Sequence, residues 1–373
     1  MVRTVGVEEE LLLVDPETRR LGPRSPQVLK EFREHGAGRR PAVADDDLDH
    51  ELFRHQVEIR TGPETDLAEI RAQVLASRRH AAEAAEAAGL VIVASGILPC
   101  GGMPLQVTDN DRYRHMVETF GRVATYGGTC GMHVHVVVDS DEEGVAVIDR
   151  IAPWLPILVA VAGNSPFNEG EDTGYASWRS ESWGRWPSAT STEQFGSVAG
   201  YRDACRFLLE SGAALDEGML YLAARLSPGN PTVEVRVADV CTDPEDALLV
   251  AALVRGLVET AAGEAESGRE PDRWRAEALR ACQWRAARYG VSDTLIHPVR
   301  REPAPAREVL EALTGHVADA LADAGDAELV ADGVDRVTAQ SGASQQRAAY
   351  ERTGEAEGVV DDLIERTRAS WDS

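Results

Sequence analysis

The sequence predicts an α+β fold whose mostly antiparallel sheet carries helices on one face and ionisable side chains on the other. Four segments alternate apolar and ionisable residues with a period of two, which is typical of strands with one exposed face. Fully buried parallel strands would instead be continuous apolar runs. The segments between and after these strands have helical periodicity, so we expect them to cover the apolar face.

The first predicted strand, residues 4–14, contains three consecutive glutamates in an otherwise apolar run. Because alternate side chains share a face, Glu8 and Glu10 point together and Glu9 points the opposite way. Two like charges side by side on a half-buried sheet are unfavourable unless a cation holds them. The segment therefore favours a cation site over a solvated strand end. We expect Glu9 to pair with an arginine on the apolar face, or to lie at a bulge that turns it outward.

The other three alternating strands are residues 53–61, 130–139 and 232–238. Each has apolar side chains on one face and ionisable groups on the other; the ionisable pairs are Glu58 and Arg60, His133 and His135, and Glu234 and Arg236. A single strand of this kind most often carries a cross-strand ion pair or a structural histidine. Four strands with the same asymmetry favour an open, charged active-site face that binds cations.

Capping and breaker residues predict the remaining elements. Residues 23–50 are mixed and polar and end in an acidic run, Asp45-Asp46-Asp47 with Asp49, which is expected to be a solvated loop. A capping box at Asp66 and Glu69 starts a helix that Gly89 ends. The other expected elements are an apolar strand at 90–98, a loop at 99–104, helices at 112–120, 152–162 and 243–263, and mostly helical residues at 272–373 with a break at 298–305 and a terminal helix near 358–370.

Residues 163–200 have no visible period. Glycine, serine, asparagine and proline are mixed there with aromatic and basic residues, among them Tyr175, Trp178 and Arg179. Long irregular segments inside compact domains are usually functional or disordered, and so many tryptophans argue against disorder. We therefore expect this segment to be a loop that covers a substrate.

Composition excludes several classes of partner and mechanism. The 373 residues include 38 basic and 63 acidic side chains, so a net charge of −25 argues against nucleic acid and anionic membranes as partners. Lys30 is the only lysine, which excludes a lysine-containing phosphate loop. Five cysteines form no C-x-x-C pair, no signal-peptide pattern is present, and the apolar run at 155–163 is too short to span a bilayer. These features predict a reduced, soluble, cytoplasmic protein.

The ionisable residues of the four strands suggest a particular metal chemistry. Carboxylate ligands with one imidazole fit Mg²⁺ or Mn²⁺ better than Zn²⁺, which favours cysteine and histidine. Such ions beside arginines can hold the β- and γ-phosphates of ATP without a lysine loop and can neutralise charge during phosphoryl transfer.

Several motifs together resemble the carboxylate–amine ligase family, which is also called glutamate–cysteine ligase type 2. The resemblance covers residues 4 to about 260, with a weaker similarity near 346–350 and in the terminal helix. The motifs are Gly6-Val-Glu8-Glu-Glu10, Glu51-Leu52 through Val57-Glu58-Ile59, Arg112-Tyr113, Gly131-Met-His133-Val-His135-Val, Asn164-Ser-Pro-Phe167, Asp172-Thr-Gly-Tyr-Ala-Ser-Trp-Arg179 and Thr232-Val-Glu234-Val-Arg236.

The resemblance implies a fold similar to the glutamine synthetase and glutamate–cysteine ligase superfamily. That fold is a curved, mostly antiparallel sheet with helices on its convex face and a concave face that holds ATP and two or three Mg²⁺ or Mn²⁺ ions. It implies a single catalytic domain over residues 1–373, with a sheet core at about 4–260 and a helical C-terminal part at about 272–373. The partners would be small-molecule substrates only, and a homo-oligomer is compatible with the superfamily.

The resemblance also implies roles for individual residues. The implied metal ligands are Glu8, Glu10, Glu51, Glu58, His135 and Glu234. Arg236, Arg60 and His133 would contact the nucleotide, with Arg236 neutralising the charge that develops on phosphate. Arg179 would hold the α-carboxylate of the substrate, a task suited to its forked donors, beside Tyr175 and Trp178.

The implied activity is ATP-dependent formation of an amide between the side-chain carboxylate of glutamate, or of a similar acid, and an amine, through an acyl phosphate. Weak glutamate–cysteine ligase activity is expected, and the sequence leaves the amine open. The rival is a metal-dependent amide hydrolase, because His133-x-His135 also resembles a metal strand of amidohydrolases. A non-catalytic binding protein is a further alternative, but a pure binder would not need so many carboxylates.

Overall fold

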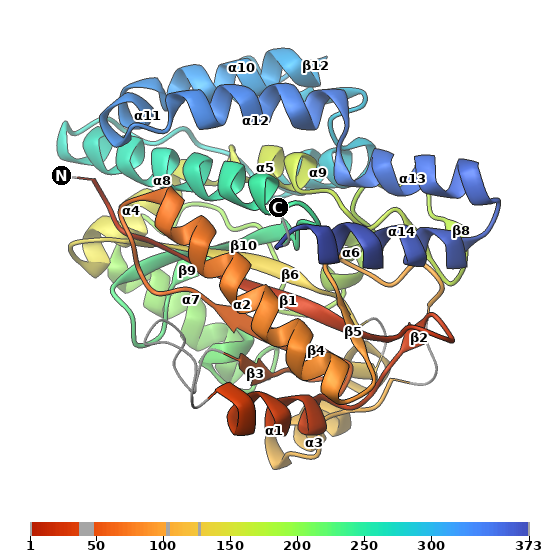
Figure 1. Ribbon diagram of the computed structural model, residues 1–373. Coiled ribbons are helices and arrows are strands. Elements are labelled where there is room, and N and C mark those ends of the chain that lie inside the picture. Colours follow the sequence, from red (N-terminus) through yellow and green to blue (C-terminus); the bar gives the residue numbers. More distant parts are fainter. Residues whose placement is uncertain (1, 37–47, 102–104, 126–127, 372–373) are drawn as a thin grey trace.

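An open, eight-stranded antiparallel sheet forms the centre of the computed structural model, which describes residues 2–36, 48–101, 105–125 and 128–371 (Figure 1). The strand order is β3-β4-β1-β6-β10-β9, and β2 and β5 also pair with β1. Every strand pair in the described chain is antiparallel, so the predicted sheet type is confirmed.

The bounds of the elements are as follows. The sheet strands are β1 (Val5–Asp15), β2 (Arg20–Leu21), β3 (Leu48–His50), β4 (Gln56–Arg60), β5 (Val91–Val93), β6 (Gly131–Val137), β9 (Ala224–Leu226) and β10 (Thr232–Asp239), and two small hairpins are formed by β7 (Phe167–Asn168) with β8 (Glu171–Asp172) and by β11 (Thr294–Ile296) with β12 (Pro303–Pro305). The helices are α1 (Ser25–Gly36), α2 (Leu67–Ala87), α3 (Asp111–Phe120), α4 (Asp141–Ile151), α5 (Leu155–Val161), α6 (Trp178–Trp183), α7 (Val198–Glu210), α8 (Pro244–Glu266), α9 (Ala276–Tyr289), α10 (Ala306–His316), α11 (Ala318–Ala324), α12 (Ala327–Ala339), α13 (Gly342–Thr353) and α14 (Ala356–Ala369), with 3₁₀ turns η1 (Gly121–Thr125) and η2 (Glu217–Met219).

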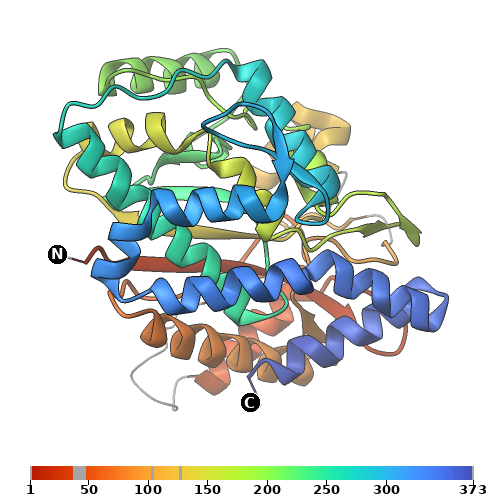
Figure 2. The same cartoon turned by 90° about the horizontal axis from the view of Figure 1, so that it is seen from above.

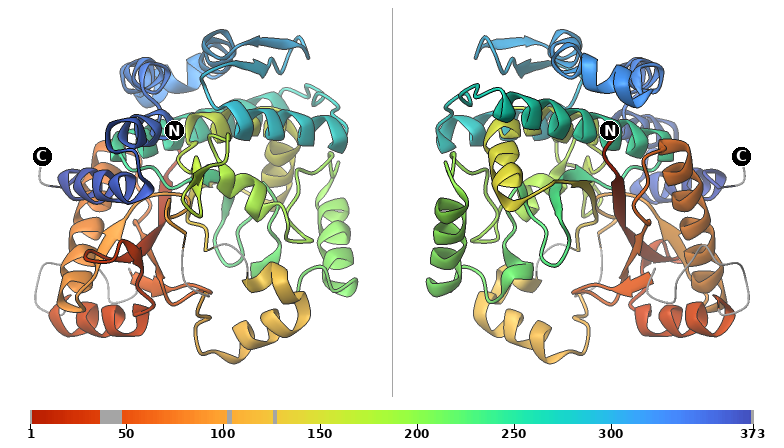
Figure 3. Two further views of the ribbon diagram at one scale, coloured as in Figure 1. Left: turned by 90° about the vertical axis from the view of Figure 1, so that its right-hand side faces the viewer. Right: turned by 90° about the vertical axis from the view of Figure 1, so that its left-hand side faces the viewer.

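Helices cover one face of the sheet in two layers. α2, α4, α5 and α8 pack directly on the strands, and α11 and α12 pack on the outer side of α8 (Figure 3). The α12–α14 segment runs along the same side of the molecule, and α14 contacts β5 (Figure 2). The apolar face of the strands contributes Val7, Val134 and Val235 to a core shared with Leu253 of α8. The predicted sheet with helices on its apolar face is confirmed; the single catalytic domain stays a prediction.

The strand register gathers the ionisable residues on the opposite face. Directly paired residues in an antiparallel sheet share a face. The relevant pairs are Glu8 with both Arg60 and His133, Glu10 with Glu58, Gly6 with His135, and Glu234 with both His135 and Arg225. The four alternating strands are therefore neighbours in the sheet, and their charged sides form one continuous face.

Glu9 points to the helix-covered face and forms a buried ion pair with Arg78 of α2. The two side chains are 1% and 0% exposed, and Arg78 Nε and Nη2 each donate to Glu9 carboxylate oxygens at 2.7 Å. Arg78 also donates to the carbonyl oxygens of Cys241 and Thr242, which lie between β10 and α8. The expected arginine partner of Glu9 is thus present, and it joins β1, α2 and the start of α8.

Within residues 23–50 the sequence predicted only the acidic loop, and Asp49 of that run lies in a strand instead. Helix α1 and strand β3 lie within that range, and the acidic residues at 45–47 lie outside the described residues. Val28, Leu29 and Phe32 form the buried side of α1. This apolar stripe is short and interrupted by charged residues, so it gives a weak periodic signal.

Other differences concern element bounds and elements that the sequence did not predict. The strand expected at 90–98 is only β5, Val91–Val93; α4, α7 and β9 were not predicted; and the segment 163–200 contains α6 in addition to irregular chain. The helix expected at 152–162 begins at Leu155, after Pro153, with Pro156 in its first turn. The helix predicted after Asp66, the helix after Asp243, the break at 298–305 and the terminal helix are confirmed as α2, α8, the β11–β12 hairpin and α14.

A bulge in β10 changes the expected alternation of this strand. Val235 pairs with Val134, but Ala238 rather than Val237 pairs with Met132, so one extra residue is inserted. Bulges bend the strand and redirect side chains, often next to active sites. The insertion lies at Arg236 and Val237, where the charged face of the sheet meets a second cavity described below.

No single helix among the described residues is long and apolar enough to cross a membrane; α4 and α5 pass that test only jointly, as a pair bent by 68°.

The buried ion pair leads to a stability prediction. Glu9→Gln leaves the Arg78 guanidinium without a charged partner in the core, so we expect the free energy of unfolding to fall by roughly 3 kcal/mol. Urea denaturation followed by circular dichroism measures this change. Lys30→Met, which removes one partner of the exposed Lys30–Glu34 pair, should leave the midpoint nearly unchanged. Equal midpoints for Glu9→Gln and the wild-type protein would contradict a stabilising role for the pair.

Candidate metal and substrate site

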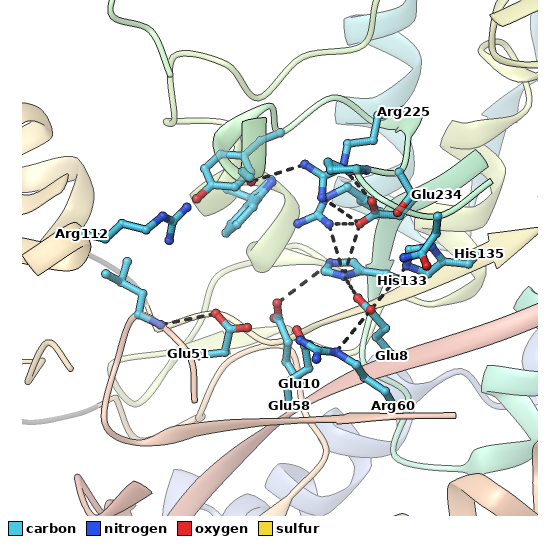
Figure 4. A pocket seen from close by; sticks show the side chains of 18 of the residues that line it. Glu8, Glu10, Glu51, Glu58, Arg60, Arg112, His133, His135, Arg225 and Glu234 are labelled. Carbon is cyan, nitrogen blue, oxygen red and sulfur yellow. Dashed lines mark hydrogen bonds and ion pairs between the residues drawn. The ribbon is translucent and has the colours of Figure 1, made fainter. Parts of the chain in front are cut away.

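A cavity of about 450 Å³ lies over the charged face of the sheet (Figure 4). Its lining contains five glutamates and four arginines, together with two histidines and aromatic side chains. The charged residues are Glu8, Glu10, Glu51, Glu58, Glu234, Arg60, Arg112, Arg225 and Arg236, with His133 and His135 between them. All six residues predicted to be metal ligands line this one cavity, as do the predicted nucleotide contacts Arg60, His133 and Arg236.

Glu8 of β1 lies between the two histidines of β6. Its Oε2 is 3.1 Å from His133 Nδ1, and its Oε1 is 3.5 Å from both His135 Nε2 and Arg60 Nε. Burial opposes ionisation of Glu8, but the hydrogen bonds and charges of His133 and His135 outweigh it and hold its pKa well below the usual range. Glu8 is therefore an ionised oxygen donor between two imidazoles.

Glu10, Glu51 and Glu58 form an acidic cluster beside Glu8. Burial, followed by repulsion from Glu58 and Glu10, raises the pKa of Glu51 well above its usual value. Burial and repulsion from Glu8 also raise the pKa of Glu58, although Arg60 Nε donates to Glu58 at 2.7 Å. Three carboxylates this close cannot all stay ionised without a further cation.

Glu234 of β10 is held by two arginines. Arg225 Nε of β9 donates to Glu234 Oε2 at 2.7 Å, and Arg236 Nη1 donates to Glu234 Oε1. Burial alone would raise the pKa of Glu234, but Arg236, His133 and Arg225 lower it to about 2. Arg225 also donates to the carbonyl oxygens of residues 217, 218 and 220, which fixes its guanidinium next to Glu234.

These side chains form three groups that could each hold a cation. Within each group the ligand atoms lie within 4.8 Å of one another; the groups are Glu8, His135 and Glu234; Glu8, Glu58 and His133; and Glu10, Glu51 and Glu58. His135 Nδ1 is 3.0 Å from Thr232 Oγ1, and its buried Nε2 faces Glu8 Oε1 at 3.5 Å. A histidine whose second nitrogen is fixed in this way is typical of metal ligands. The oxygen-rich donors fit Mg²⁺ or Mn²⁺.

Sequence reasoning missed two features of this cavity. Arg225 was not predicted, because β9 is only three residues long and shows no alternation. His133 was assigned to the nucleotide alone, but its contact with Glu8 also makes it a candidate metal ligand. In the first case only the three-dimensional pairing of β9 with β10 supplies the signal.

Arg179 of α6 is 2% exposed and does not line the first cavity. Its Nη atoms lie 3.4 and 3.5 Å from the carbonyl oxygens of Arg236 and Val237, and its Nε has no hydrogen-bond partner. The guanidinium packs over Gly131, where a Cβ atom would collide with it. It also lies over the ring of Trp183, 5.7 Å from the centroid.

A second cavity of about 930 Å³ adjoins the first and shares Trp183, Tyr221 and Arg236 with it. Arg179 and Trp178 line this second cavity. Tyr175 lines neither cavity; its hydroxyl accepts from Trp284 Nε1 at 3.2 Å, and its ring contacts Trp178. The structure thus brings Arg179 and Trp178 together in the second cavity and leaves Tyr175 outside both cavities.

Comparison with known proteins identifies relatives along the whole chain. Residues 4–366 match the model described as Glutamate-cysteine ligase family 2. The chain is 61% identical over 372 residues to the "Putative glutamate--cysteine ligase 2-1" of Nocardioides sp., covering 100% of this chain and 97% of that protein. It is 46% identical over 371 residues to the protein of the same description in Streptomyces avermitilis, covering 98% of this chain and 100% of that one.

Two solved structures share the fold. The glutamate–cysteine ligase of Francisella tularensis in complex with AMP matches with a TM-score of 0.69 and 13% identity, over 100% of this chain and 90% of that one. The bifunctional glutathione synthetase of Pasteurella multocida matches with a TM-score of 0.67 and 15% identity, over 99% of this chain and 52% of that one. The predicted fold class is confirmed.

The acidic cluster leads to a prediction about metal binding. Saturating Mg²⁺, at about 100 times its Kd, should stabilise the wild-type protein by about 2.7 kcal/mol, measured as a rise in Tm by differential scanning fluorimetry. Glu51→Gln should lose this gain, yet be more stable than the wild type without metal, because it removes a crowded charge. Glu328→Gln, an exposed change on α12, should keep the full gain.

The pH dependence of the metal-free proteins supplies a second check. Because the fold raises the pKa of Glu51, its ionised form destabilises the folded state above the pKa of the unfolded carboxyl. The advantage of Glu51→Gln over the wild type should therefore be present at neutral pH and shrink as the pH falls. A constant advantage from pH 7 to acidic pH would contradict a charge-based cause.

Proposed function

The chain belongs to glutamate–cysteine ligase family 2, and we propose that it is an ATP-dependent ligase that joins the side-chain carboxylate of glutamate, or of a similar acid, to an amine. The observation that carries this proposal is the set of three adjoining groups of candidate metal ligands, two with carboxylates and a histidine and one with carboxylates alone, beside Arg60, Arg225 and Arg236. Divalent ions held by glutamates, next to arginines, are suited to the phosphates of ATP in a chain with a single lysine.

Each group of the first cavity receives a role in this proposal. Glu8, Glu10, Glu51, Glu58, His135 and Glu234 would hold two or three Mg²⁺ or Mn²⁺ ions, with His133 as a further ligand or nucleotide contact. When bound, these ions would supply positive charge that neutralises the phosphates. Arg60 and Arg236 would supply additional positive charge, and Arg225 keeps Glu234 ionised and oriented.

The acid would lie across the boundary of the two cavities. Its side-chain carboxylate would approach the first cavity, and its α-carboxylate would approach Arg179, whose Nε lacks a partner. Arg236 lines both cavities and its Nε also lacks a partner, so it can donate to a group that forms at the boundary. A buried guanidinium at such a position stabilises developing negative charge more strongly than in water.

The proposed chemistry has two balanced steps. A carboxylate oxygen of the acid attacks the γ-phosphorus of ATP, so that an acyl phosphate forms and ADP leaves with the bonding electrons. The neutral amine then attacks the acyl carbon; the C–N bond forms, the bond from that carbon to the phosphate oxygen breaks, and phosphate leaves as the proton of the amine is removed. The residues act by positioning and by charge neutralisation.

A metal-dependent amide hydrolase is the rival from another class. His133 and His135 are the histidines that line the first cavity within the described chain, and the remaining donors there are carboxylates. A hydrolase of the amidohydrolase kind would need further histidines from later strands. The open antiparallel sheet also differs from the barrel of those enzymes.

The proposed function is tested with hydroxylamine, which intercepts an acyl phosphate as a hydroxamate. Purified protein with ATP, Mg²⁺, glutamate and hydroxylamine should release ADP and give glutamyl hydroxamate in equal amounts. Omission of any one component, or addition of excess EDTA, should abolish both products. Metal-dependent cleavage of a glutamyl amide without ATP would instead support the hydrolase.

A single substitution tests the metal-binding face. Glu234→Gln should lower kcat/KM for hydroxamate formation by on the order of 100-fold, because it removes a metal ligand and leaves Arg225 and Arg236 without a counter-charge. Thermal unfolding of the variant checks that the fold survives. Glu328→Gln serves as the matched control and should retain wild-type turnover; comparable activity of Glu234→Gln would refute this site.

A further inference from the structure

The second cavity has the character of a binding site for an aromatic ligand. Trp178 and Trp183 come from the segment 163–200, and Trp284 comes from α9 on the other side. Trp284 is 43% exposed, and among the three large exposed apolar side chains of the described residues it is the one that lines either of these two cavities. An indole exposed to water lacks the favourable free energy of burying its large apolar surface, which a ligand could supply.

Charged groups occupy defined positions in the same cavity. Arg280 lies one helical turn before Trp284, so both side chains lie on one face of α9 and line the cavity. Arg280 is exposed and makes no hydrogen bond or ion pair among the described residues. Glu181 of α6 lines the same space, and burial raises its pKa while Arg280 and Arg185 oppose the rise. The cavity thus offers a guanidinium and a carboxylate between aromatic walls.

The size and connection of the cavity indicate which substrate it would hold. At about 930 Å³ it is twice as large as the first cavity and lies at the upper end of small-ligand sites. It reaches the first cavity through Trp183, Tyr221 and Arg236, where the acyl phosphate would form. An amine that enters through the second cavity would therefore meet the acyl carbon at Arg236.

We propose that the second cavity is the acceptor site and that it selects an α-amino acid with an aromatic side chain, its carboxylate bound by Arg280 and its ring packed against Trp284 and Trp178. This inference rests on the proposed ligase function. Glu181 holds the incoming ammonium group before the amine loses its proton and attacks. A guanidinium and an indole one turn apart can bind both ends of such a molecule.

The test compares three acceptors in the complete enzyme with ATP, Mg²⁺ and glutamate. L-Phenylalanine should give a kcat/KM about tenfold above that of L-alanine, which lacks the ring, and about tenfold above that of phenethylamine, which lacks the carboxylate. Trp284→Ala should remove the preference over alanine, and Arg280→Ala the preference over phenethylamine. Phe207→Ala, an exposed ring on α7, and Arg273→Ala, an exposed arginine before α9, should retain both preferences.

Direct binding separates this inference from the proposed function. L-Phenylalanine should bind to the protein with glutamate and a non-hydrolysable ATP analogue in isothermal titration calorimetry, and Trp284→Ala should weaken the Kd about tenfold. Binding without ADP release by any acceptor would overturn the ligase proposal and support the site. Hydroxamate formation without binding of phenylalanine, or with equal binding by Trp284→Ala, would overturn the acceptor site and leave the ligase intact.

Discussion

The buried ion pair between Glu9 and Arg78 stabilises the orientation of β1 that turns the candidate metal ligands Glu8 and Glu10 to the opposite face. A strand with three consecutive glutamates must send one of them to the face opposite the other two. A lone carboxylate among packed helices would be too costly, so Arg78 neutralises Glu9 and satisfies the carbonyl oxygens between β10 and α8. The same pair therefore fixes which face of the sheet each β1 side chain points to, with Glu8 and Glu10 toward the cavity. Its hydrogen bonds also anchor the segment that follows β10, the strand of Glu234.

Opposite charges are distributed unevenly within the cavity. At one end Glu234 is held by Arg225 and Arg236 and remains ionised, and Glu8 is held by both histidines. At the other end Glu10, Glu51 and Glu58 share a single arginine contact, and burial raises the pKa of Glu51 and Glu58. Glu234 and Glu8 are thus neutralised by arginines or histidines of the protein. The cluster of Glu10, Glu51 and Glu58 needs an external cation for its carboxylates to be ionised together.

The charged face could be predicted from the sequence because alternation with a period of two is a strong signal over a long strand. The prediction failed for residues outside the strands, on very short strands and at a bulge. Alternation alone predicts that the charged face carries Glu8, Glu58, His135 and Glu234. Glu51 lies before β4 and could be assigned only through the family motif. Arg225, on a three-residue strand, gave no pattern, and the bulge after Val235 cannot be read from residues that all favour strands. The Trp-rich segment was identified by composition, but its division between two cavities required the fold.

The lining of the two cavities also limits where the proton of the amine can go. Arginine stays protonated at any accessible pH, and burial raises the pKa of Tyr221, so neither can act as the base at the boundary. The histidines on the charged face of the sheet contact Glu8 and Thr232. The remaining candidates for the proton acceptor are a carboxylate, such as Glu181 of α6, and the departing phosphate itself. The carboxylate and the phosphate would each accept the proton only after negative charge has shifted from the amine to the acyl group. The second half of the proposed reaction therefore depends on Arg236, which positions the reacting groups and stabilises that charge.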